Sequence, residues 1–305
     1  MSQVGADRAP TSRNGAACPQ PRGSYCLPVA FDLSIALPLL PCGIIMTMMK
    51  SVIVVPTYNE AENLPLLVEQ IIRYFPDVHL LVMDDASPDG TADLCDSLFA
   101  SNSAYSNFKV VRRTGPRGLG RAYRDGFQRA LEGGYERIVQ MDADLSHDPA
   151  RLPDLMSRSM QSDLVIGSRY CPDGGVRNWP ARRIWLSRFA CWYVHRVARI
   201  PVADATGGYR CWSRRALEAV QLDTLASEGY SFQVEMLHRA CRSGMTIAEI
   251  PIIFTDRQFG RSKISRSVLA ESFIMPWKLR FAPWVPGEAA GNLLTAKSAT
   301  HVNRE

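Results

Sequence analysis

The sequence predicts an α/β fold in which a mostly parallel central sheet is flanked by helices. From Lys50 onward, short apolar runs alternate with segments of helical periodicity, the pattern of repeated strand–helix–strand units. Polar motifs that carry acidic residues directly follow several of the apolar runs. Because parallel strands end at the same edge of a sheet, we expect these motifs to gather where open α/β sheets bind ligands.

The first part of the pattern alternates strictly. Val52–Val55 is a short apolar run, and the helical period that follows it reaches Tyr74. Asp89-Gly90 supplies a turn before the second helix, and Gly118-Leu119-Gly120 opens the third. The predicted strands here are 52–55, 79–83, 108–112 and 137–141, and the predicted helices are 62–74, 91–99 and 118–131.

Beyond residue 141 the alternation continues once and then fades. A helix over 149–159 and a strand over 163–166 complete it, and a helix over 228–243 and a strand over 246–254 come later. Between them, residues 182–199 form a helix in which arginines interleave with aromatic residues. Such a helix is either a solvated surface element or one lying near an anionic membrane with its aromatic rings at the headgroups.

The N-terminal residues differ from the body in composition. Residues 1–25 are rich in Pro, Gly, Ser, Arg and Ala, and the apolar stretch 26–49 is broken by prolines and an aspartate. We therefore predict a disordered and apolar extension over 1–49. An alternative is that translation starts at Met46, Met48 or Met49. A signal peptide fits less well, because its charged region would lie far from the start.

The body and the tail divide into three expected parts. Residues 50–266 are predicted to form the catalytic domain, 267–286 an amphipathic interfacial helix, and 287–305 a disordered tail. No segment of the body reaches about 18 uninterrupted apolar residues, so we expect no spanning helix there.

Composition narrows the class of protein. With 46% hydrophobic and 21% charged residues, the 305-residue chain can bury a large core. The net charge of +5 is too small to indicate nucleic-acid binding by itself. Eight cysteines are scattered without Cys-x-x-Cys or zinc-like spacing, so we expect reduced core cysteines in a cytoplasmic protein.

Asp142 and Asp144 are the most informative pair of residues. They stand two residues apart at the end of a predicted strand, where the chain turns and both carboxylates can converge on one ion. Mg²⁺ and Mn²⁺ prefer such oxygen ligands and leave coordination positions for water and substrate phosphates. Asp-x-Asp alone is weak evidence, because loop acids produce it by chance, but acids at two other strand ends strengthen it.

Those two strand ends indicate a nucleotide. Tyr58 could stack on a base, and Glu60 could accept hydrogen bonds from a base or ribose, although an acid also suits an ordinary helix N-terminus. Asp85 ends the second strand, where an acid usually contacts the base or ribose. The dinucleotide fingerprint and the P-loop are both absent. Acids and a metal would therefore hold the nucleotide, as suits a nucleotide-sugar whose diphosphate must leave.

Cationic loops complete the predicted site. Arg117 and Arg121 flank a glycine-rich turn, Arg169 follows the fifth strand, and 256–263 is a basic loop. Together they could neutralise a diphosphate leaving group and an anionic acceptor. No Gly-x-Ser-x-Gly elbow exists, and His147 is expected to be a loop or supporting residue, so covalent hydrolase chemistry is disfavoured.

These motifs occur together in a recognisable order. The set resembles the polyprenol (dolichol) monophosphate mannose synthases, inverting family 2 glycosyltransferases with a GT-A fold, a Rossmann-like nucleotide-sugar transferase fold. The resemblance covers roughly residues 50–280, and the segment 175–179 is most similar to the bacterial, actinobacterial-type enzymes. The motifs that carry it are Pro56–Glu60, Asp84–Thr91, Gly118–Gly120, Asp142–His147, Gly167–Tyr170, Gly175–Trp179, Gly229–Gln233, and Asp256-Arg257 with Lys263.

The resemblance implies a reaction and a set of site residues. It implies transfer of mannose from GDP-mannose to a polyprenyl phosphate with inversion, Mg²⁺ or Mn²⁺ as cofactor, and no nucleic-acid partner. By the family pattern Asp142 and Asp144 hold the metal, and Asp144, Arg257 and Lys263 are catalytic. The nucleotide-sugar would contact Pro56, Tyr58, Glu60, Met83, Asp85, Asp142, Ala143, Asp144, Arg169, Arg257 and Lys263.

The sequence departs from the family pattern in three ways. Some relatives have Gln where Ser146 stands, so a third metal ligand there is open, and Ala86 replaces a common Gly. The spanning helices that some relatives carry are also missing. Contact with the membrane surface would therefore come from surface helices or from a separate membrane-anchoring protein, on the cytoplasmic face of the membrane.

The acceptor chemistry needs no general base, because a phosphate monoester has a second pKa of about 6 and arrives largely ionised. Two alternatives stay open. One is a polyprenyl-phosphate glucosyltransferase that uses UDP-glucose, which a donor panel would separate. The other is a non-catalytic nucleotide-sugar-binding scaffold, for which binding without turnover would be the sign.

Overall fold

The structure is a computed structural model that describes residues 49–227, 229, 231–256 and 266–281, with the helix backbone alone for 266–271. All of these residues belong to one compact unit, Leu40–Glu305. The predictions for residues 1–48, for the basic loop 257–265 and for the tail 282–305 lie outside the described residues.

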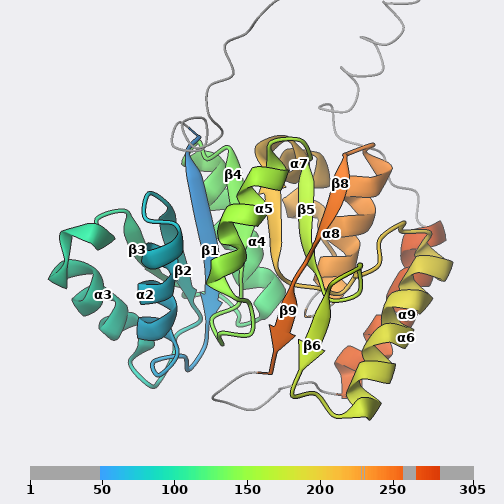
Figure 1. Ribbon diagram of the computed structural model, residues 1–305, viewed down its shortest axis with the longest axis horizontal. Helices are drawn as coiled ribbons and strands as arrows, with labels where there is room; N and C mark the ends of the chain where they lie inside the picture. The colour runs from blue at the N-terminus through green and yellow to red at the C-terminus, as the bar shows by residue number, and fades with distance from the viewer. Residues whose placement is uncertain (1–48, 228, 230, 257–265, 282–305) are drawn as a thin grey trace, which may run out of the picture. The chain divides into compact units, whose positions relative to one another are not determined.

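In the described part of the chain, seven strands form one sheet in the order β3-β2-β1-β4-β7-β5-β8 (Figure 1). All neighbours pair in parallel except β7, which is antiparallel to both β4 and β5. The predicted α/β fold with a mostly parallel sheet is confirmed. The strands are β1 (Ser51–Thr57), β2 (His79–Asp84), β3 (Phe108–Arg112), β4 (Arg137–Gln140), β5 (Leu164–Ser168), β7 (Arg210–Ser213) and β8 (Ile247–Pro251).

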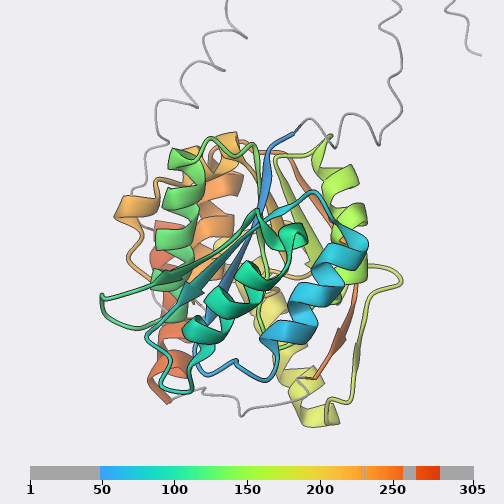
Figure 2. The same ribbon diagram turned by 90° about the vertical axis from the view of Figure 1, so that its left-hand side faces the viewer.

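Strand β1 shows why helices cover both faces of the sheet. Its side chains alternate between two hydrophobic cores, as the two-residue period of a strand requires. Val52 and Val54 pack on the side of α4 (Leu119–Glu132), α7 (Arg214–Val220) and α8 (Ser231–Arg242). Ile53 and Val55 pack on the side of α2 (Leu64–Tyr74), α3 (Thr91–Ser101) and α5 (Leu152–Ser159). Figure 2 shows the sheet between these helix layers.

The predicted strand 246–254 is wrong in one respect, because it divides into β8 and β9 (Ile253–Thr255). Pro251 ends β8, where a proline is tolerated because β8 is the edge strand of the sheet. The next residue, Ile252, connects the two sheets: its N–H still donates to the Ser168 carbonyl of β5, whereas its own carbonyl accepts from the Gly175 N–H. Strand β9 then pairs in parallel with β6 (Gly175–Arg177) in a separate two-stranded sheet.

Two helices lie beside the carboxyl ends of the strands. α6 (Ala181–Ala198) and α9 (Arg266–Phe281) run side by side at the lower right of Figure 1. The Tyr193 hydroxyl of α6 donates to the Phe273 carbonyl of α9 at 2.8 Å. Within the described ranges, none of the helices combines the length and the apolar character that crossing a membrane requires. Short 3-10 turns complete the elements at Ser103–Tyr105, Pro149–Arg151 and Leu222–Thr224.

Candidate active site

The loops that follow β1, β2 and β4 carry the predicted acids, and each contains one non-glycine residue with left-handed backbone. The φ angles are 61° at Asn59, 54° at Ala86 and 60° at Leu145. This conformation is uncommon for alanine and leucine and costs on the order of 1–3 kcal/mol. The fold therefore holds the loops after β2 and β4 in strained shapes at one edge of the sheet, whereas asparagine tolerates this conformation in the loop after β1.

Two acids of the predicted nucleotide motif have structural roles. The buried Asp84 carboxylate accepts from the Thr57 hydroxyl at 3.0 Å and from both the N–H and the hydroxyl of Ser87. Asp89 accepts from the Ala61 N–H at 3.1 Å. These contacts join the loop after β2 to the loop after β1.

Asp85 instead connects the end of β2 to the start of α4. Its carboxylate accepts from the Arg113 guanidinium and, at 2.9 Å, from the Gly118 N–H. Arg113 also pairs with Asp125 of α4. Beside Gly118, the Arg117 guanidinium lies 4.6 Å from the centroid of the Tyr58 ring and donates to its hydroxyl. The predicted base-binding residues Tyr58 and Asp85 therefore both contact the glycine-rich turn.

The other predicted nucleotide residues lie along the same edge but do not line the cavity that contains Asp142 and Asp144. Pro56 pairs with Met83 in the β1–β2 ladder, and Met83 lines a separate polar cavity of about 320 Å³ beside Arg113. Glu60 accepts from the Asn63 amide at 2.7 Å. The Ala143 side chain is buried in the core shared with α2 and α5. Arg257 and Lys263 lie outside the described residues.

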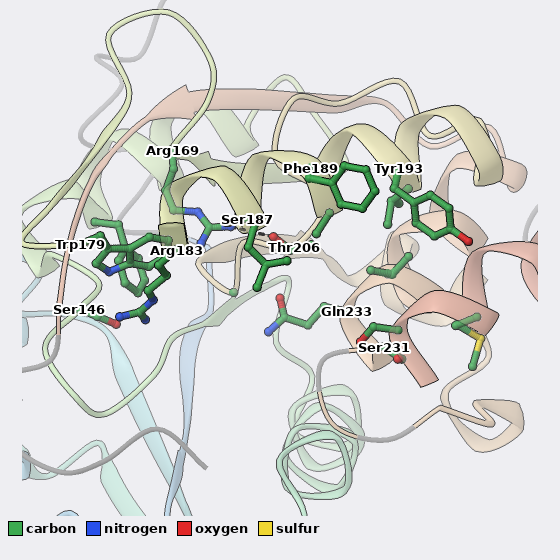
Figure 3. Close-up of a pocket in the computed structure, with 18 of the residues that line it drawn as sticks. Ser146, Arg169, Trp179, Arg183, Ser187, Phe189, Tyr193, Thr206, Ser231 and Gln233 are labelled. Carbon is green, nitrogen blue, oxygen red and sulfur yellow. Dashed lines mark hydrogen bonds between the residues drawn. The ribbon is translucent and has the colours of Figure 1, made fainter. Parts of the chain in front are cut away.

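Asp142 and Asp144 line a cavity of about 270 Å³ at the carboxyl end of β4. Figure 3 shows this cavity, with Ser146, Arg169 and Arg183 among its labelled residues. Asp142 is held from two sides: the Tyr123 hydroxyl donates to its Oδ1 at 2.7 Å, and its own N–H donates to His147 Nδ1 at 3.1 Å. Burial raises the pKa of Tyr123 well above its ordinary value, and the nearby Asp142 charge adds to the effect. Tyr123 therefore stays a hydrogen-bond donor.

His147 supports this arrangement as a neutral ring. It is buried, and its ring lies 4.9 Å from that of Tyr209 in a stacked arrangement. Burial lowers its pKa, although the charges of Asp142 and Asp144 oppose that shift. Because Nδ1 accepts a hydrogen bond, Nε2 is the nitrogen that carries the proton.

The donor set at the two acids fits a hard divalent cation. Asp144 Oδ1 accepts from the Ser146 N–H at 3.1 Å and from its hydroxyl at 2.5 Å, so Ser146 orients this carboxylate. No group of three or more His, Cys, Asp or Glu side chains that could hold a metal occurs among the described residues. A pair of carboxylates suits Mg²⁺ or Mn²⁺, since these ions complete their coordination with water and substrate phosphates.

Two arginines face the same cavity. Arg169 forms a bidentate pair with the fully buried Asp204, with Nε–Oδ2 and Nη2–Oδ1 distances of 2.7 Å, and donates to Thr206 at 2.8 Å. Burial favours a lower pKa for Arg169, but Asp204 outweighs it and raises the pKa. On α6, the Arg183 guanidinium lies 3.9 Å from the centroid of the Trp179 ring.

The far wall of the cavity is apolar. It is formed by α6 and α9, which contact each other. The cavity therefore changes from acidic and basic groups at the strand ends to aliphatic and aromatic groups between the two helices. Figure 3 shows Arg169 and Arg183 at one side of the cavity and Phe189 and Tyr193 at the other. The apolar lining residues are Leu186, Phe189, Ala190, Tyr193, Val194, Phe273, Met275 and Pro276.

Of the residues predicted for the site, the cavity brings together Asp142, Asp144 and Arg169, with Ser146 and His147. It also contains Arg183, Ser187, Thr206, Ser231 and Gln233, to which the sequence analysis gave no role in the site. Two signals were present. Arg183, Ser187, Ala190 and Val194 recur at the spacing of one helix face. The motif 229–233 was noted as part of the family pattern without a function.

Comparisons with known proteins identify the family to which the chain is similar. The family described as glycosyl transferase family 2 matches residues 52–221. The chain is 43% identical over 234 residues to the polyprenol monophosphomannose synthase of Mycolicibacterium smegmatis, covering 76% of this chain and 88% of that protein. It is 42% identical over 226 residues to the undecaprenyl-phosphate mannosyltransferase of Micrococcus luteus, covering 74% and 92%.

Among solved structures, the fold is similar to that of glucosyl-3-phosphoglycerate synthase from Mycobacterium tuberculosis. One such structure, in complex with Mn²⁺, uridine diphosphate and phosphoglyceric acid, aligns with a TM-score of 0.56 at 19% identity, over 80% of this chain and 82% of that chain. A second, with Mn²⁺, UDP-glucose and phosphoglyceric acid, gives 0.55 at 18% identity, over 79% and 84%. At this level of identity the likeness concerns the fold alone.

Proposed function

Because the chain belongs to glycosyl transferase family 2, we propose that it transfers mannose from GDP-mannose to a polyprenyl phosphate with inversion. As a member of this family it is a glycosyltransferase with the GT-A fold expected from the sequence. The names of the two curated relatives support mannose as the sugar and a polyprenyl phosphate as the acceptor. GDP as the nucleotide rests on the family resemblance of the sequence motifs.

The observation that carries the proposal is the change of character along one cavity. Asp142 and Asp144 lie with Arg169 and Arg183 at its polar end, and α6 and α9 supply the apolar wall. An acceptor with an anionic head and a long apolar chain matches both parts. A water-soluble acceptor would leave the wall of α6 and α9 without a complementary group.

The residues of the cavity would then have different roles in binding the metal, the acceptor and the donor. Asp142 and Asp144 would hold Mg²⁺ or Mn²⁺, which when bound stabilises the charge of the departing diphosphate. Tyr123 and Ser146 keep these carboxylates oriented. We assign Arg183, with the neighbouring Ser187, to the acceptor phosphate. Arg169, and the predicted catalytic residues Arg257 and Lys263, would contact phosphates of the nucleotide-sugar.

The proposed chemistry is a single displacement. An oxygen of the ionised acceptor phosphate attacks C1 of mannose while the bond from C1 to the diphosphate breaks, so the α-linked donor gives polyprenyl β-mannosyl phosphate and GDP. No proton must be removed from the nucleophile, because a phosphate monoester is largely a dianion near neutral pH. Pro56, Tyr58, Glu60, Met83, Asp85 and Ala143 are proposed to bind the nucleotide beside this centre.

We further propose that the enzyme works peripherally on the cytoplasmic face of a membrane, with 50–266 as catalytic domain and 267–286 at the lipid surface. Support comes from α6 and α9, where large apolar side chains are exposed: Trp185 by 77%, Trp192 by 57% and Phe281 by 70%. Basic side chains accompany them on both helices. Aromatic and basic residues together suit an anionic interface. A separate anchoring protein could assist.

The test is a donor panel in detergent with a polyprenyl phosphate as acceptor. Radiolabelled GDP-mannose and UDP-glucose are compared with Mg²⁺, with Mn²⁺ and with a chelator. The proposal predicts labelled lipid from GDP-mannose alone and none with chelator. Labelling from UDP-glucose alone would mean that the donor is UDP-glucose and not GDP-mannose. Nucleotide-sugar binding without any transfer would favour the scaffold alternative.

A further inference from the structure

Gln233 is a buried polar residue whose side-chain carbonyl has no hydrogen-bond partner in the part of the chain that the structure describes. The residue is 3% exposed and lines the cavity that contains the two acids. Among the described residues, its Oε1 receives no hydrogen bond. Its backbone carbonyl accepts from Arg210 at 2.8 Å, which explains the path of the main chain but not the choice of side chain. A buried amide oxygen left unpaired costs stability, so its presence needs another explanation.

The amide lies at the charged end of the cavity. A Cβ built on Gly208 would stand 3.0 Å from Gln233 Nε2, 3.3 Å from His147 Cε1 and 3.6 Å from Asp142 Oδ2. Gln233 and Asp142 therefore approach the same glycine. In Figure 3 the amide projects from α8 toward the part of the cavity where Thr206, Ser146 and Arg183 lie. Ser231, which also has a buried unpaired oxygen, lies nearer the α9 side.

The chemistry of the amide selects among the groups that the proposed reaction brings beside Asp142. Ionised phosphate oxygens only accept hydrogen bonds, so they cannot satisfy Oε1. A sugar hydroxyl both donates and accepts, and can pair with Oε1 and Nε2 of one amide. We propose that Gln233 is a specificity-determining residue that binds a hydroxyl group of the transferred sugar. This inference rests on the proposed function, since it requires a bound nucleotide-sugar.

The test pairs a substitution with the removal of single hydroxyls from the donor. Gln233→Met keeps the size of the side chain but cannot make the hydrogen bonds. The donors are the nucleotide-sugar that the panel identifies and its singly deoxygenated analogues. For the wild type, kcat/KM should fall roughly tenfold or more on the analogue that lacks the contacted hydroxyl. For Gln233→Met, kcat/KM on the full donor should fall by a similar factor, and replacing that donor by the analogue should lower it little further.

Ser231→Ala is the matched control, because it removes the other unpaired buried oxygen of α8 and leaves the Gln233 amide in place. We expect it to retain the wild-type penalty for the deoxygenated donor. If, for every hydroxyl, the factor by which Gln233→Met lowers kcat/KM and the factor by which deoxygenation lowers it multiply in the combination, the two changes act independently and Gln233 does not bind the sugar. A rise in KM for polyprenyl phosphate alone would assign the amide to the acceptor and overturn the inference.

A second readout separates binding from a structural role. Because the amide oxygen accepts no hydrogen bond from the described part of the chain, Gln233→Met should leave the thermal midpoint unchanged or raise it. A marked fall in the midpoint together with multiplicative penalties would make Gln233 a structural residue. If the wild type transfers no sugar at all, the proposed function fails. If the wild type transfers sugar but Gln233→Met shows the same loss of kcat/KM as the wild type on every deoxygenated donor, only the proposed role of Gln233 fails.

Discussion

At the scale of single residues, Asp204 is the group on which the charge balance of the cavity depends. It is fully buried and pairs in a bidentate manner with Arg169. Asp204→Asn would leave the Arg169 guanidinium buried without its counter-charge, so we expect the free energy of unfolding to fall by about 3–5 kcal/mol in urea titrations.

The exposed pair between Asp93 and Arg112 provides the control for that substitution. The Asp93 side chain is 84% exposed, so Asp93→Asn should change the free energy of unfolding by less than about 1 kcal/mol. Equal effects of Asp204→Asn and Asp93→Asn would show that burial does not determine the strength of the Arg169 pair.

Ala86 has a backbone conformation that its Cβ makes sterically unfavourable. Its φ of 54° lies in the left-handed region, which glycine adopts without strain. We expect Ala86→Gly to raise the free energy of unfolding by roughly 0.5–1 kcal/mol. Ala92→Gly in helix α3 should instead lower it by about 1 kcal/mol. A loss of stability in Ala86→Gly would contradict the strain at this loop.

At the scale of elements, α8 carries a pH-sensitive residue. Burial, together with Arg242 and Arg239, lowers the pKa of His238 to about 4. The unfolded chain takes up this proton near pH 6.5, whereas the folded chain does not until near pH 4, so stability falls as the pH drops between these values. His238→Gln should show a smaller loss of unfolding free energy from pH 7 to pH 5. Equal losses in variant and wild type would exclude His238 as the source.

The exposed faces of α6 and α9 can be tested as a lipid-binding element. We expect Trp185→Ser with Trp192→Ser to weaken binding to vesicles of anionic lipid at least roughly tenfold in a sedimentation assay. Leu66→Ser with Tyr74→Ser removes two exposed but smaller apolar side chains from α2, and serves as the control for a general loss of exposed apolar surface. Equal losses in both variants would mean that α6 has no special role at the lipid surface.

The elements also show what the sequence could predict. Strands β1 to β5 were predicted within a few residues, because strands buried on both faces form apolar runs. Strand β7 was missed, since it contains the buried Arg210, which resembles a surface residue in sequence. Its guanidinium donates to the carbonyls of Ala205, Gly207 and Gln233, and partners of this kind leave no sequence pattern.

The site was predictable to a similar degree. Strand ends placed the acids at one edge of the sheet, as the structure has them. The division of roles among Asp84, Asp85 and Asp142 was not visible, because their partners Thr57, Arg113 and Tyr123 come from distant parts of the chain. The inner face of α6 was missed because its arginines were considered together as one basic surface.

At the scale of the whole molecule, the protein combines charged and apolar groups in one cavity. The acids and arginines come from the carboxyl edge of the sheet, and the apolar wall comes from two helices that pack against each other. Neither part alone would suit an amphiphilic acceptor. Together they explain how a chain with no spanning helix among its described residues could act on a membrane lipid.

The most direct measurement compares the wild type with Asp144→Asn in one assay. Both proteins receive GDP-mannose, a polyprenyl phosphate in detergent and Mg²⁺ or Mn²⁺. The lipid product is then identified and quantified by mass spectrometry. The proposed function predicts mannosyl phosphate lipid from the wild type and at least about a thousandfold less from Asp144→Asn. Equal product from both proteins, or none from the wild type, would contradict it.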